Sequence, residues 1–238
     1  MESLRDTYVL LAGATGGIGR ETARLISESG ARIFLTGRDP QKLAELAASI
    51  GLDSRYCQAA ELSDPADVER LRQRYFEVYP EIGVLVNASG IGIIRPFDTL
   101  SADELNRSLQ SNLIAPFLLL KAFLPAMKER NKGLVISIPG VLGKVPMAGA
   151  AAYCASKYGL VGMLQSIREE LKRTNIRITQ LYLGGVDTPF WDRIDLRVQR
   201  DRMILAAEAA KAIWFLCQQP SSGVVSEMVL QPFNHQAI

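Results

Sequence analysis

Residues 8–19 read YVLLAGATGGIG, a short apolar run followed by a glycine-rich turn. The first five residues have the length and composition of a buried strand, and a helical pattern begins near Arg20. Glycines lack a Cβ atom, so the chain can turn tightly and bring backbone N–H groups close to a phosphate at a helix N-terminus. A tight turn needs glycines even without a ligand, but strand, glycines and helix in this order favour a dinucleotide site. The residues predicted to form its phosphate loop are Gly13, Thr15, Gly16, Gly17, Ile18 and Gly19.

Apolar runs similar to this first one recur along the whole chain. They occupy residues 31–36, 82–87, 133–138, 176–183 and 225–230, and a weaker one occupies residues 54–60. Amphipathic stretches of helical length separate them, which is typical of a parallel sheet covered by helices on both faces. The chain has 238 residues, no repeat and no linker. We therefore expect one domain, residues 1–238, of doubly wound α/β class with about seven strands.

Two helix starts are marked in the sequence. Ser101 and Glu104 have the spacing of a capping box, which predicts a long helix from there to about Arg130. Asp39 before Pro40 is typical of a helix N-cap followed by proline in the first turn. Asp39 is thus expected to cap a helix rather than to bind a ligand.

The end of the second predicted strand bears on the choice of cofactor. In dinucleotide sites, an acidic residue near this point binds the ribose hydroxyls of NAD, whereas an arginine accommodates the extra phosphate of NADP. Gly37 offers no carboxylate, and Arg38 offers a planar set of N–H donors. NADP is therefore favoured over NAD, although Arg38 is also compatible with a solvated residue before a helix.

Composition narrows the class of partner. The chain has 27 Lys and Arg against 25 Asp and Glu, a net charge of +2 that favours neither nucleic acid nor an anionic membrane. Apolar runs stay shorter than the roughly 18 residues of a membrane span, and the N-terminus lacks the pattern of a signal peptide. Three widely spaced cysteines are expected to be reduced, and one histidine, His235, gives little material for a metal site. We expect a cytoplasmic protein without a metal, acting on a small molecule.

Further motifs follow the glycine turn in a characteristic order. Asn87-Ala88-Ser89-Gly90 follows the fourth strand, Asn112 lies in the long helix, and Tyr153 and Lys157 form Tyr-x-x-x-Lys. With the glycine turn, this order resembles the short-chain dehydrogenase/reductase family from about residue 7 to residue 230. The resemblance implies a Rossmann-like fold, a nicotinamide cofactor, and hydride transfer between that cofactor and a carbonyl or alcohol.

The resemblance also implies which residues surround the cofactor. Residues 87–90 match a turn beside the adenosine ribose, residues 61–62 match the acidic and aliphatic pair at the adenine, and residues 184–188 match the contact with the nicotinamide. The residues so implied are Glu61, Leu62, Asn87, Ala88, Ser89, Gly90, Gly184, Val186 and Thr188, together with Tyr153 and Lys157.

Hydride transfer to a carbonyl builds negative charge on oxygen, so a proton donor must lie within hydrogen-bonding reach. Tyr153 is the candidate acid and base. Lys157, one helical turn later, is expected to lower the pKa of the tyrosine and, as the resemblance implies, to donate to the cofactor ribose. Asn112 matches the family position that holds a water in a proton relay to the lysine, although a buried asparagine can instead bond a backbone carbonyl.

Position 140 departs from the family pattern. The family normally has its catalytic serine thirteen residues before the tyrosine, where this chain has Gly140. Loss of one donor to a developing oxyanion typically lowers turnover about 100-fold to 1000-fold. Ser137 is not expected to replace it without a changed backbone path, whereas Ser89 or a bound water is a candidate. Pro139-Gly140 is equally compatible with a turn that makes room for a bulky substrate.

The sequence gives weaker signals for the substrate and for the oligomeric state than for the cofactor site. Residues 189–203 occupy the place of the family's substrate loop, where Phe190 and Trp191, with Met147, either line an apolar pocket or simply pack. The loop's arginines at 193, 197, 200 and 202 either receive an anionic substrate or belong to a solvated mixed-charge helix. The helix after Tyr153 has apolar residues on more than one face, which predicts a subunit interface. The resemblance implies that this interface forms a homodimer or homotetramer.

Two functions from different classes remain. The favoured one is an NADP(H)-dependent oxidoreductase acting on a carbonyl or alcohol. The alternative is a catalytically weakened NADP(H)-binding sensor or interaction protein, which Gly140 favours. A pure binding role would not need Tyr153, Lys157 and Asn112 together.

Overall fold

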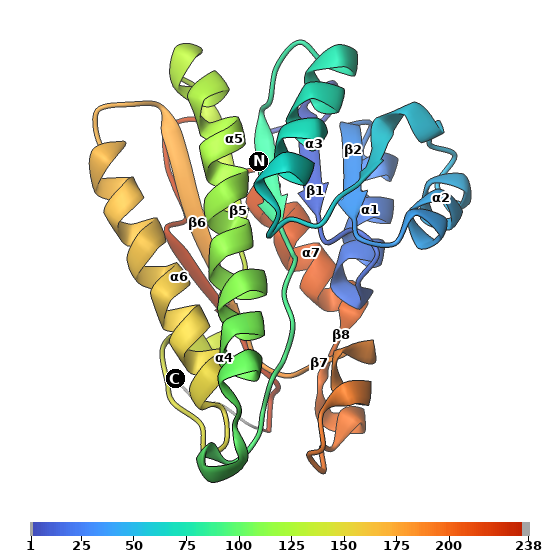
Figure 1. Cartoon of the computed structure of the whole chain (residues 1–238). Helices are drawn as coiled ribbons and strands as arrows, with labels where there is room; N and C mark the ends of the chain where they lie inside the picture. Colours follow the sequence, from blue (N-terminus) through green and yellow to red (C-terminus); the bar gives the residue numbers. More distant parts are fainter. Residues whose placement is uncertain (1, 235–238) are drawn as a thin grey trace.

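The computed structural model describes residues 2–234 and contains one seven-stranded parallel sheet in the order β3-β2-β1-β4-β5-β6-β9 (Figure 1). Its strands are β1 (Tyr8–Ala12), β2 (Arg32–Gly37), β3 (Cys57–Ala59), β4 (Val84–Asn87), β5 (Gly133–Ser137), β6 (Ile176–Leu183) and β9 (Glu227–Leu230). The strand order reverses direction between β1 and β4, and ligands bind at the carboxyl ends of the strands at such a switch point. The predicted doubly wound sheet of about seven strands is confirmed.

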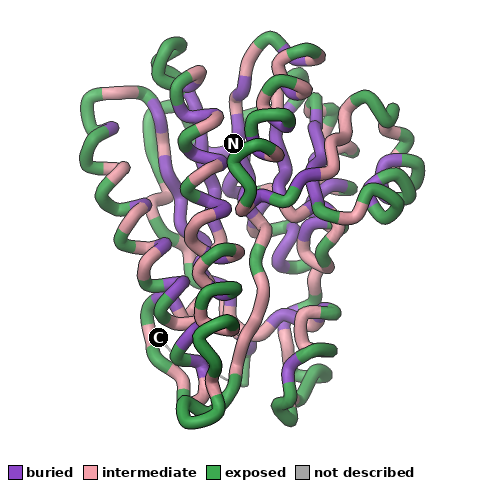
Figure 2. Tube along the Cα trace, in the orientation of Figure 1, coloured by how far each residue is buried: buried purple, intermediate pink, exposed green. Residues whose placement is uncertain are grey.

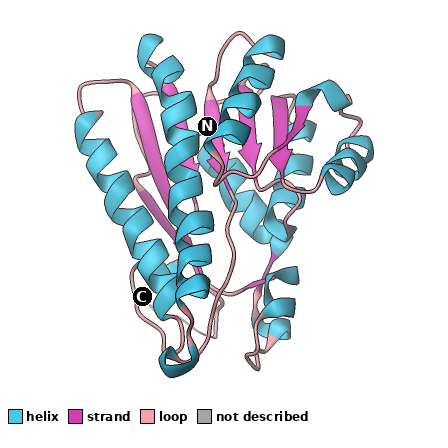
Figure 3. Cartoon of the chain, in the orientation of Figure 1, coloured by secondary structure: helices cyan, strands magenta, loops and turns pink. Residues whose placement is uncertain are grey.

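Helices cover both faces of the sheet, because the residues of each strand alternate between two apolar cores (Figure 3). Leu10 and Leu85 belong to one core, and Val9 and Leu11 belong to the other. The first core is covered by α3 (Pro65–Val78), α5 (Ala115–Glu129) and α6 (Ala151–Glu170), and the second by α1 (Gly17–Glu28), α2 (Pro40–Ser49) and α7 (Ala206–Cys217). Figure 2 shows the consequence, with strands buried and helices exposed on their outer sides.

The helix predicted from Ser101 to about Arg130 is continuous, but it contains a π turn. Helix α4 (Ala102–Leu109) begins with the predicted capping box, and a π turn at Gln110–Ile114 joins it to α5. Asn112 lies in this turn and is 1% exposed. Inserted residues of this kind often occur at functional sites. Nothing in the sequence pattern predicts the π turn.

By length and composition alone, the continuous helix Ala102–Glu129 could cross a membrane, a test that core helices also pass. Leu119, Phe123 and Met127 of this helix are buried against the sheet. Its apolar character therefore has an explanation within the fold.

A second, two-stranded sheet was not predicted. It pairs β7 (Val186–Asp187) with β8 (Ile204–Leu205) beyond the carboxyl end of β6. The chain between them forms two short 3₁₀ turns, Pro189–Arg193 and Arg200–Arg202, rather than the expected mixed-charge helix. We call residues 186–205 the covering segment; it lies at the lower edge of the sheet in Figure 1.

Other local predictions can be compared with the structure directly. The Asp39 carboxylate accepts hydrogen bonds from the backbone N–H groups of Gln41 (3.0 Å) and Lys42 (3.1 Å), so the predicted N-cap is confirmed. The three cysteines are free thiols. Within residues 2–234, no group of three or more His, Cys, Asp or Glu side chains is placed to hold a metal ion. His235 lies outside the described residues.

A hydrogen bond also joins helices α1 and α7. The indole N–H of Trp214 in α7 donates to the hydroxyl of Ser29, at the end of α1, at 2.6 Å.

Candidate active site

The glycine-rich turn joins β1 to α1, which begins at Gly17, three residues before the expected start. Gly13 has a φ of 78°, a conformation that favours glycine. A Cβ atom on Gly13 would lie 2.6 Å from the backbone nitrogen of Ser89, and one on Gly19 would lie 2.1 Å from the carbonyl oxygen of Gly13. Gly16 is the N-cap of α1 and supplies no side-chain acceptor, so the first N–H groups of the helix are not capped by a side chain. Space thus requires glycine at positions 13 and 19, and backbone conformation also requires it at position 13.

The end of β2 is where the sequence predicts contact with the extra phosphate of NADP. Gly37 is buried, and a Cβ atom on it would lie 2.9 Å from Oγ1 of Thr15, a residue of the predicted phosphate loop. Arg38, the next residue, is exposed. Because Asp39 caps α2, the residue after Arg38 offers no free carboxylate to a ribose. Cofactor preference itself stays a prediction.

The residues implied at the adenine differ from each other in accessibility. Glu61 is exposed, and its carboxylate accepts a hydrogen bond from the Ser63 hydroxyl at 2.7 Å. Leu62 is 5% exposed and packs in the core beneath α3. Little of the Leu62 side chain therefore remains for contact with an adenine.

The turn after β4 is closed by its own side chains. The Asn87 side-chain oxygen accepts hydrogen bonds from the Ser89 backbone N–H (3.2 Å) and from the Ser89 hydroxyl (2.6 Å). Ala88 continues the contact with β1, since its N–H donates to the carbonyl of Ala12 at 2.9 Å. The Ser89 hydroxyl proton already has an acceptor, so Ser89 must rotate before it can replace a missing serine.

Asn112 and Lys157 meet at Gly90. A Cβ atom on Gly90 would lie 2.9 Å from the Asn112 side-chain oxygen and 3.4 Å from the Lys157 ammonium nitrogen. The Asn112 side chain accepts from the Ile91 N–H at 2.9 Å and donates to the Ile91 carbonyl at 3.0 Å. The backbone-bonding alternative for Asn112 is therefore present, with a neighbouring loop rather than its own helix as partner, and the water relay stays a prediction.

Two buried serines that the sequence did not single out extend this contact to α6. The Asn112 amide also donates to the hydroxyls of Ser156 (3.0 Å) and Ser108 (3.3 Å). The Ser156 hydroxyl donates in turn to the carbonyl of Tyr153 at 2.7 Å. The π turn, the loop after β4 and the first turns of α6 are thus fastened together. The only sequence signal for Ser156 is its position between Tyr153 and Lys157, on the same helix.

Tyr153 and Lys157 lie on the same face of α6. Lys157 is 4% exposed; its ammonium donates to the carbonyl of Ile138 at 3.0 Å and lies 5.5 Å from the centre of the Tyr153 ring. Burial lowers the pKa of Lys157 to about 8, because a charged ammonium is poorly solvated there.

The expected lowering of the tyrosine pKa is not found. Burial raises the pKa of Tyr153, with a smaller contribution in the same direction from the neighbouring Cys154. The main cause is loss of water around the phenol, which disfavours the charged phenolate. The prediction was wrong for this state of the protein because spacing along a helix carries no information on solvation.

Position 140, where the resemblance implies a serine, has an unusual backbone. Gly140 has φ 72° and ψ 168°, a combination open mainly to glycine, and it precedes a 3₁₀ turn at Val141–Gly143. A Cβ atom on Gly140 would lie 3.4 Å from the Leu183 carbonyl oxygen, an ordinary contact. The glycine is therefore required by conformation rather than by space. Ser137, three residues earlier, is 2% exposed, and its hydroxyl has no hydrogen-bond partner among the described residues.

The covering segment contacts both ends of the site. A Cβ atom on Gly17 would lie 2.6 Å from the methyl group of Thr188, so Thr188 rests on the glycine turn. Phe190 packs against Tyr153 with ring centres 6.0 Å apart, and a Cβ atom on Gly92 would lie 2.3 Å from the Phe190 ring. Val186 and Thr188 are buried, and the N–H of Gly184 donates to the Leu230 carbonyl at 2.8 Å. Phe190 thus lies between the Tyr153 ring and the loop at Gly92.

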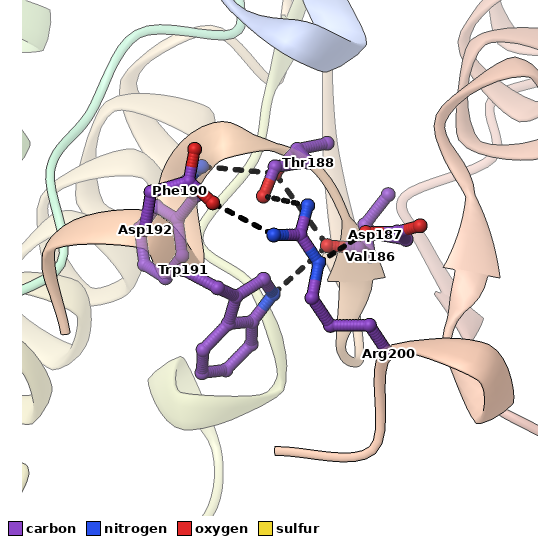
Figure 4. A network of polar contacts seen from close by, with 7 residues as sticks. All are labelled: Val186, Asp187, Thr188, Phe190, Trp191, Asp192 and Arg200. Carbon is purple, nitrogen blue, oxygen red and sulfur yellow. Dashed lines mark hydrogen bonds and ion pairs between the residues drawn. The ribbon is translucent and has the colours of Figure 1, made fainter. Parts of the chain in front are cut away.

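Polar contacts hold the covering segment in shape (Figure 4). The Arg200 guanidinium donates to the carboxylates of Asp187 (2.5 Å) and Asp192 (2.7 Å) and to the carbonyl of Thr188 (3.0 Å). The Trp191 indole N–H donates to the carbonyl of Val186 at 2.9 Å. Arg200 is thus engaged within the chain instead of being free for an anionic substrate, whereas Arg193, Arg197 and Arg202 are exposed. Met147 is partly buried before α6, and the apolar pocket that it was expected to line stays a prediction.

An open hollow of about 700 Å³ lies beside the C-terminal end of the covering segment. Its walls come from residues 201–212 and 230–234, and none of the predicted site residues lines it. The candidate active site is instead the region at the carboxyl ends of β1, β4 and β5, where the glycine turn, Gly90, Tyr153 and the covering segment meet.

Comparison with known proteins identifies the family. Residues 7–198 match the family of short chain dehydrogenases, so the chain belongs to this family of oxidoreductases. It is 29% identical to an uncharacterized oxidoreductase of Staphylococcus saprophyticus over 98% of each chain, and 28% identical to a sepiapterin reductase of Chlorobaculum tepidum over 94% of this chain and 95% of that one. A metagenomic short-chain oxidoreductase crystallised with NADP is similar in structure, with a TM-score of 0.83 and 30% identity over 97% of this chain and 99% of the other.

Proposed function

We propose that the protein is an NADP(H)-dependent oxidoreductase that transfers hydride between the nicotinamide and a carbonyl or alcohol. The observation that carries the proposal is the meeting of Asn112 and Lys157 at Gly90, with Tyr153 on the same face of α6. Tyr153 gives or takes the proton at the substrate oxygen. Lys157 supplies positive charge, and Asn112 orients the loop that borders both.

A bound dinucleotide would supply the hydride, and the chain's own residues fit it. The N-terminus of α1 and the glycines before it offer N–H groups to a pyrophosphate. Gly37 and Arg38 support NADP over NAD, because the site offers a guanidinium in place of a ribose-binding carboxylate. The NADP in the similar metagenomic structure supports the same choice.

The buried lysine and phenol suit a site that works only when loaded. Burial raises the pKa of Tyr153 and lowers the pKa of Lys157 to about 8, so neither group is activated in the empty pocket. A dinucleotide would bring hydroxyl and phosphate oxygens that stabilise the ammonium, and a stable ammonium favours the phenolate. Turnover is expected to be slower than with a serine at position 140, since one oxyanion donor is absent.

The test is oxidation of NADPH in the presence of a broad panel of aldehydes and ketones. Tyr153→Phe should lower kcat by about 100-fold or more, because it removes the proton donor while preserving the ring that packs on Phe190. The matched control is Tyr158→Phe, an exposed tyrosine on the same helix. Equal turnover in native protein and Tyr153→Phe would contradict the assignment of the phenol.

A second function is favoured by two observations, the glycine at position 140 and the packing of Phe190 over Tyr153. Both suit an NADP(H)-binding sensor or interaction protein with little chemistry. Tight NADPH binding without turnover of any substrate in the panel would support this alternative.

We also propose a cytoplasmic homodimer or homotetramer. Phe117 on α5 and Tyr158 on α6 are large apolar side chains that are 42% and 43% exposed, which supports a partner on these helices. Light scattering of the purified protein tests the assembly, and a monomer at all concentrations would contradict it.

A further inference from the structure

We infer that Arg200 is a positioning residue that holds the covering segment closed over the dinucleotide and thereby sets how long NADP(H) stays bound. The inference rests on the proposed function and adds a determinant of cofactor retention that lies outside the glycine turn and outside the Tyr153 helix. It follows from which groups Arg200 fastens and from what those groups touch.

Arg200 bonds three points of one short stretch of chain (Figure 4). Its guanidinium reaches Asp187 at the end of β7, the carbonyl of Thr188, and Asp192 in the following 3₁₀ turn. A planar guanidinium offers several N–H donors in fixed directions, so one side chain fixes three acceptors relative to each other. Residues 187–192 are therefore held as a single unit.

The held unit touches both parts of the site. Thr188 rests on Gly17 of the glycine turn, where a Cβ atom would lie 2.6 Å from its methyl group, and Pro189 is 3.4 Å from the same point. Phe190 lies against Tyr153 on one side and Gly92 on the other. A dinucleotide that extends from the glycine turn to Tyr153 would therefore lie against residues 188–190. We expect these residues to move away before it leaves.

The ion pairs of Arg200 are weak enough for the covering segment to open and close reversibly. The side chains of Arg200, Asp187 and Asp192 are 42%, 36% and 54% exposed, so water and salt weaken both ion pairs. β7 pairs with β8, so the base of the segment stays attached when the ion pairs open, whereas the bond from the Trp191 indole to the Val186 carbonyl opens together with them. The expected motion is a local opening of residues 188–199.

The neighbouring Arg197 provides a matched control. It lies on the same exposed stretch and carries the same charge, and its side chain has no ion pair or hydrogen bond to any residue from 2 to 234. Arg200→Ala and Arg197→Ala therefore change net charge and local composition equally, and they differ only in the three contacts. Asp192→Asn removes one ion pair with little change in shape and serves as a milder variant.

The experiment measures NADPH dissociation by stopped-flow fluorescence and hydride transfer by single turnover with saturating NADPH and a substrate found in the panel. Arg200→Ala should speed NADPH release about tenfold, Arg200→Lys should fall between it and the native protein, and Arg197→Ala should match the native protein. Hydride transfer in the loaded protein should change by less than about twofold, because Arg200 touches no reacting atom. The melting temperature should stay within about 2 °C, since the lost contacts are exposed.

Salt supplies an independent readout. The ratio of release rates for Arg200→Ala and native protein should fall from about tenfold at about 0.05 M KCl to about threefold at about 1 M, because salt weakens the ion pairs of the native protein. Any salt effect on the NADP phosphate is common to both proteins and cancels in the ratio.

The outcomes separate the inference from the proposed function. Equal release rates for Arg200→Ala, Arg197→Ala and a native protein that binds and oxidises NADPH would overturn the inference and leave the function intact. A native protein that binds no NADPH would overturn both. If Arg200→Ala melts well below the native protein, Asp192→Asn decides, and an unchanged release rate in that variant overturns the inference.

Discussion

The glycine turn and the Tyr153 side of the site are built by different means. Around the turn, Gly13 and Gly19 approach backbone atoms of Ser89 and of the turn itself, so this geometry is present before any ligand binds. On the other side, Tyr153 and Lys157 are buried polar groups whose pKa values are shifted by loss of water. The comparison teaches that the cofactor end is preorganised by shape, whereas the proton-transfer end carries an electrostatic cost that a ligand can relieve.

The largest effect is expected where a glycine of the turn is replaced. Gly19→Ala places a Cβ atom 2.1 Å from the Gly13 carbonyl oxygen, so the turn must shift. We expect a loss of at least about 3 kcal/mol in the free energy of unfolding, with loss of NADPH binding. Denaturant unfolding and fluorescence titration measure both. Gly16→Ala is the control for stability, because its nearest atom would be 3.4 Å away. Similar stability of Gly19→Ala and Gly16→Ala would contradict the view that the glycine turn is fixed by close contacts.

The second prediction concerns the cost of burying Lys157. The folded lysine has a pKa of about 8, whereas an ordinary lysine has a pKa of 10.5, so the unfolded chain holds more protons between these pH values. The cost of burying the charged lysine is fully present below about pH 8. The free energy of unfolding therefore rises as the pH goes from about 8 to 10.5. Lys157→Met should be more stable than native protein by up to about 3 kcal/mol at pH 7, with turnover lost.

The difference between Lys157→Met and native protein should shrink as the pH rises through this window. Unfolding by urea at several pH values measures it, with Lys172→Met, an exposed lysine, as control. A difference that is constant with pH would mean that burial does not shift this lysine.

A smaller effect is expected at Gly140, where conformation and not space requires glycine. Gly140→Ala should lower the free energy of unfolding by about 1 to 2 kcal/mol. Gly51→Ala isolates the same cost, because Gly51 has a φ of 67° and nothing within 4 Å of its added Cβ atom. Gly140→Ser should be destabilised equally. A serine variant that is as stable as the native protein and turns over faster would show that the backbone adopts the family's path when a serine is present.

The smallest effect is a gain. Gly162 lies on the exposed side of α6, with nothing within 4 Å of an added Cβ atom. Gly162→Ala should raise the free energy of unfolding by about 0.5 to 1 kcal/mol through helix propensity, with unchanged turnover. Thermal unfolding and the NADPH assay measure the two quantities. A clear loss of turnover would mean that this side of α6 contributes to the site after all.

The alternation of strands and helices, the glycine turn and the caps at Asp39 and Ser101 were predictable because each depends on residues close together in sequence. The Tyr153 and Lys157 pair was predictable for the same reason, since four residues make one helical turn. The direction of the tyrosine pKa was not, because it depends on which distant atoms exclude water.

The contacts that fasten the site were also missed. Asn112 lies in the π turn, and its bonds to Ser108 and Ser156 join α4 to α6. Asn112 and Ser156 are 44 positions apart in the sequence. Arg200 reaches back 13 residues to Asp187. Neither contact corresponds to a local sequence pattern. The alternating Arg and Asp residues of the covering segment have the same pattern whether their side chains are solvated or form ion pairs.

The indole of Trp191 gives the protein a built-in optical probe. It is one of only two tryptophans in the sequence, and it sits within the part of the chain that must lift for the coenzyme to exchange. The other, Trp214, is fixed between α1 and α7 by its bond to Ser29 and provides a steady background. Emission from Trp191, quenched when a reduced nicotinamide lies near it, would follow loading and release in real time without any label.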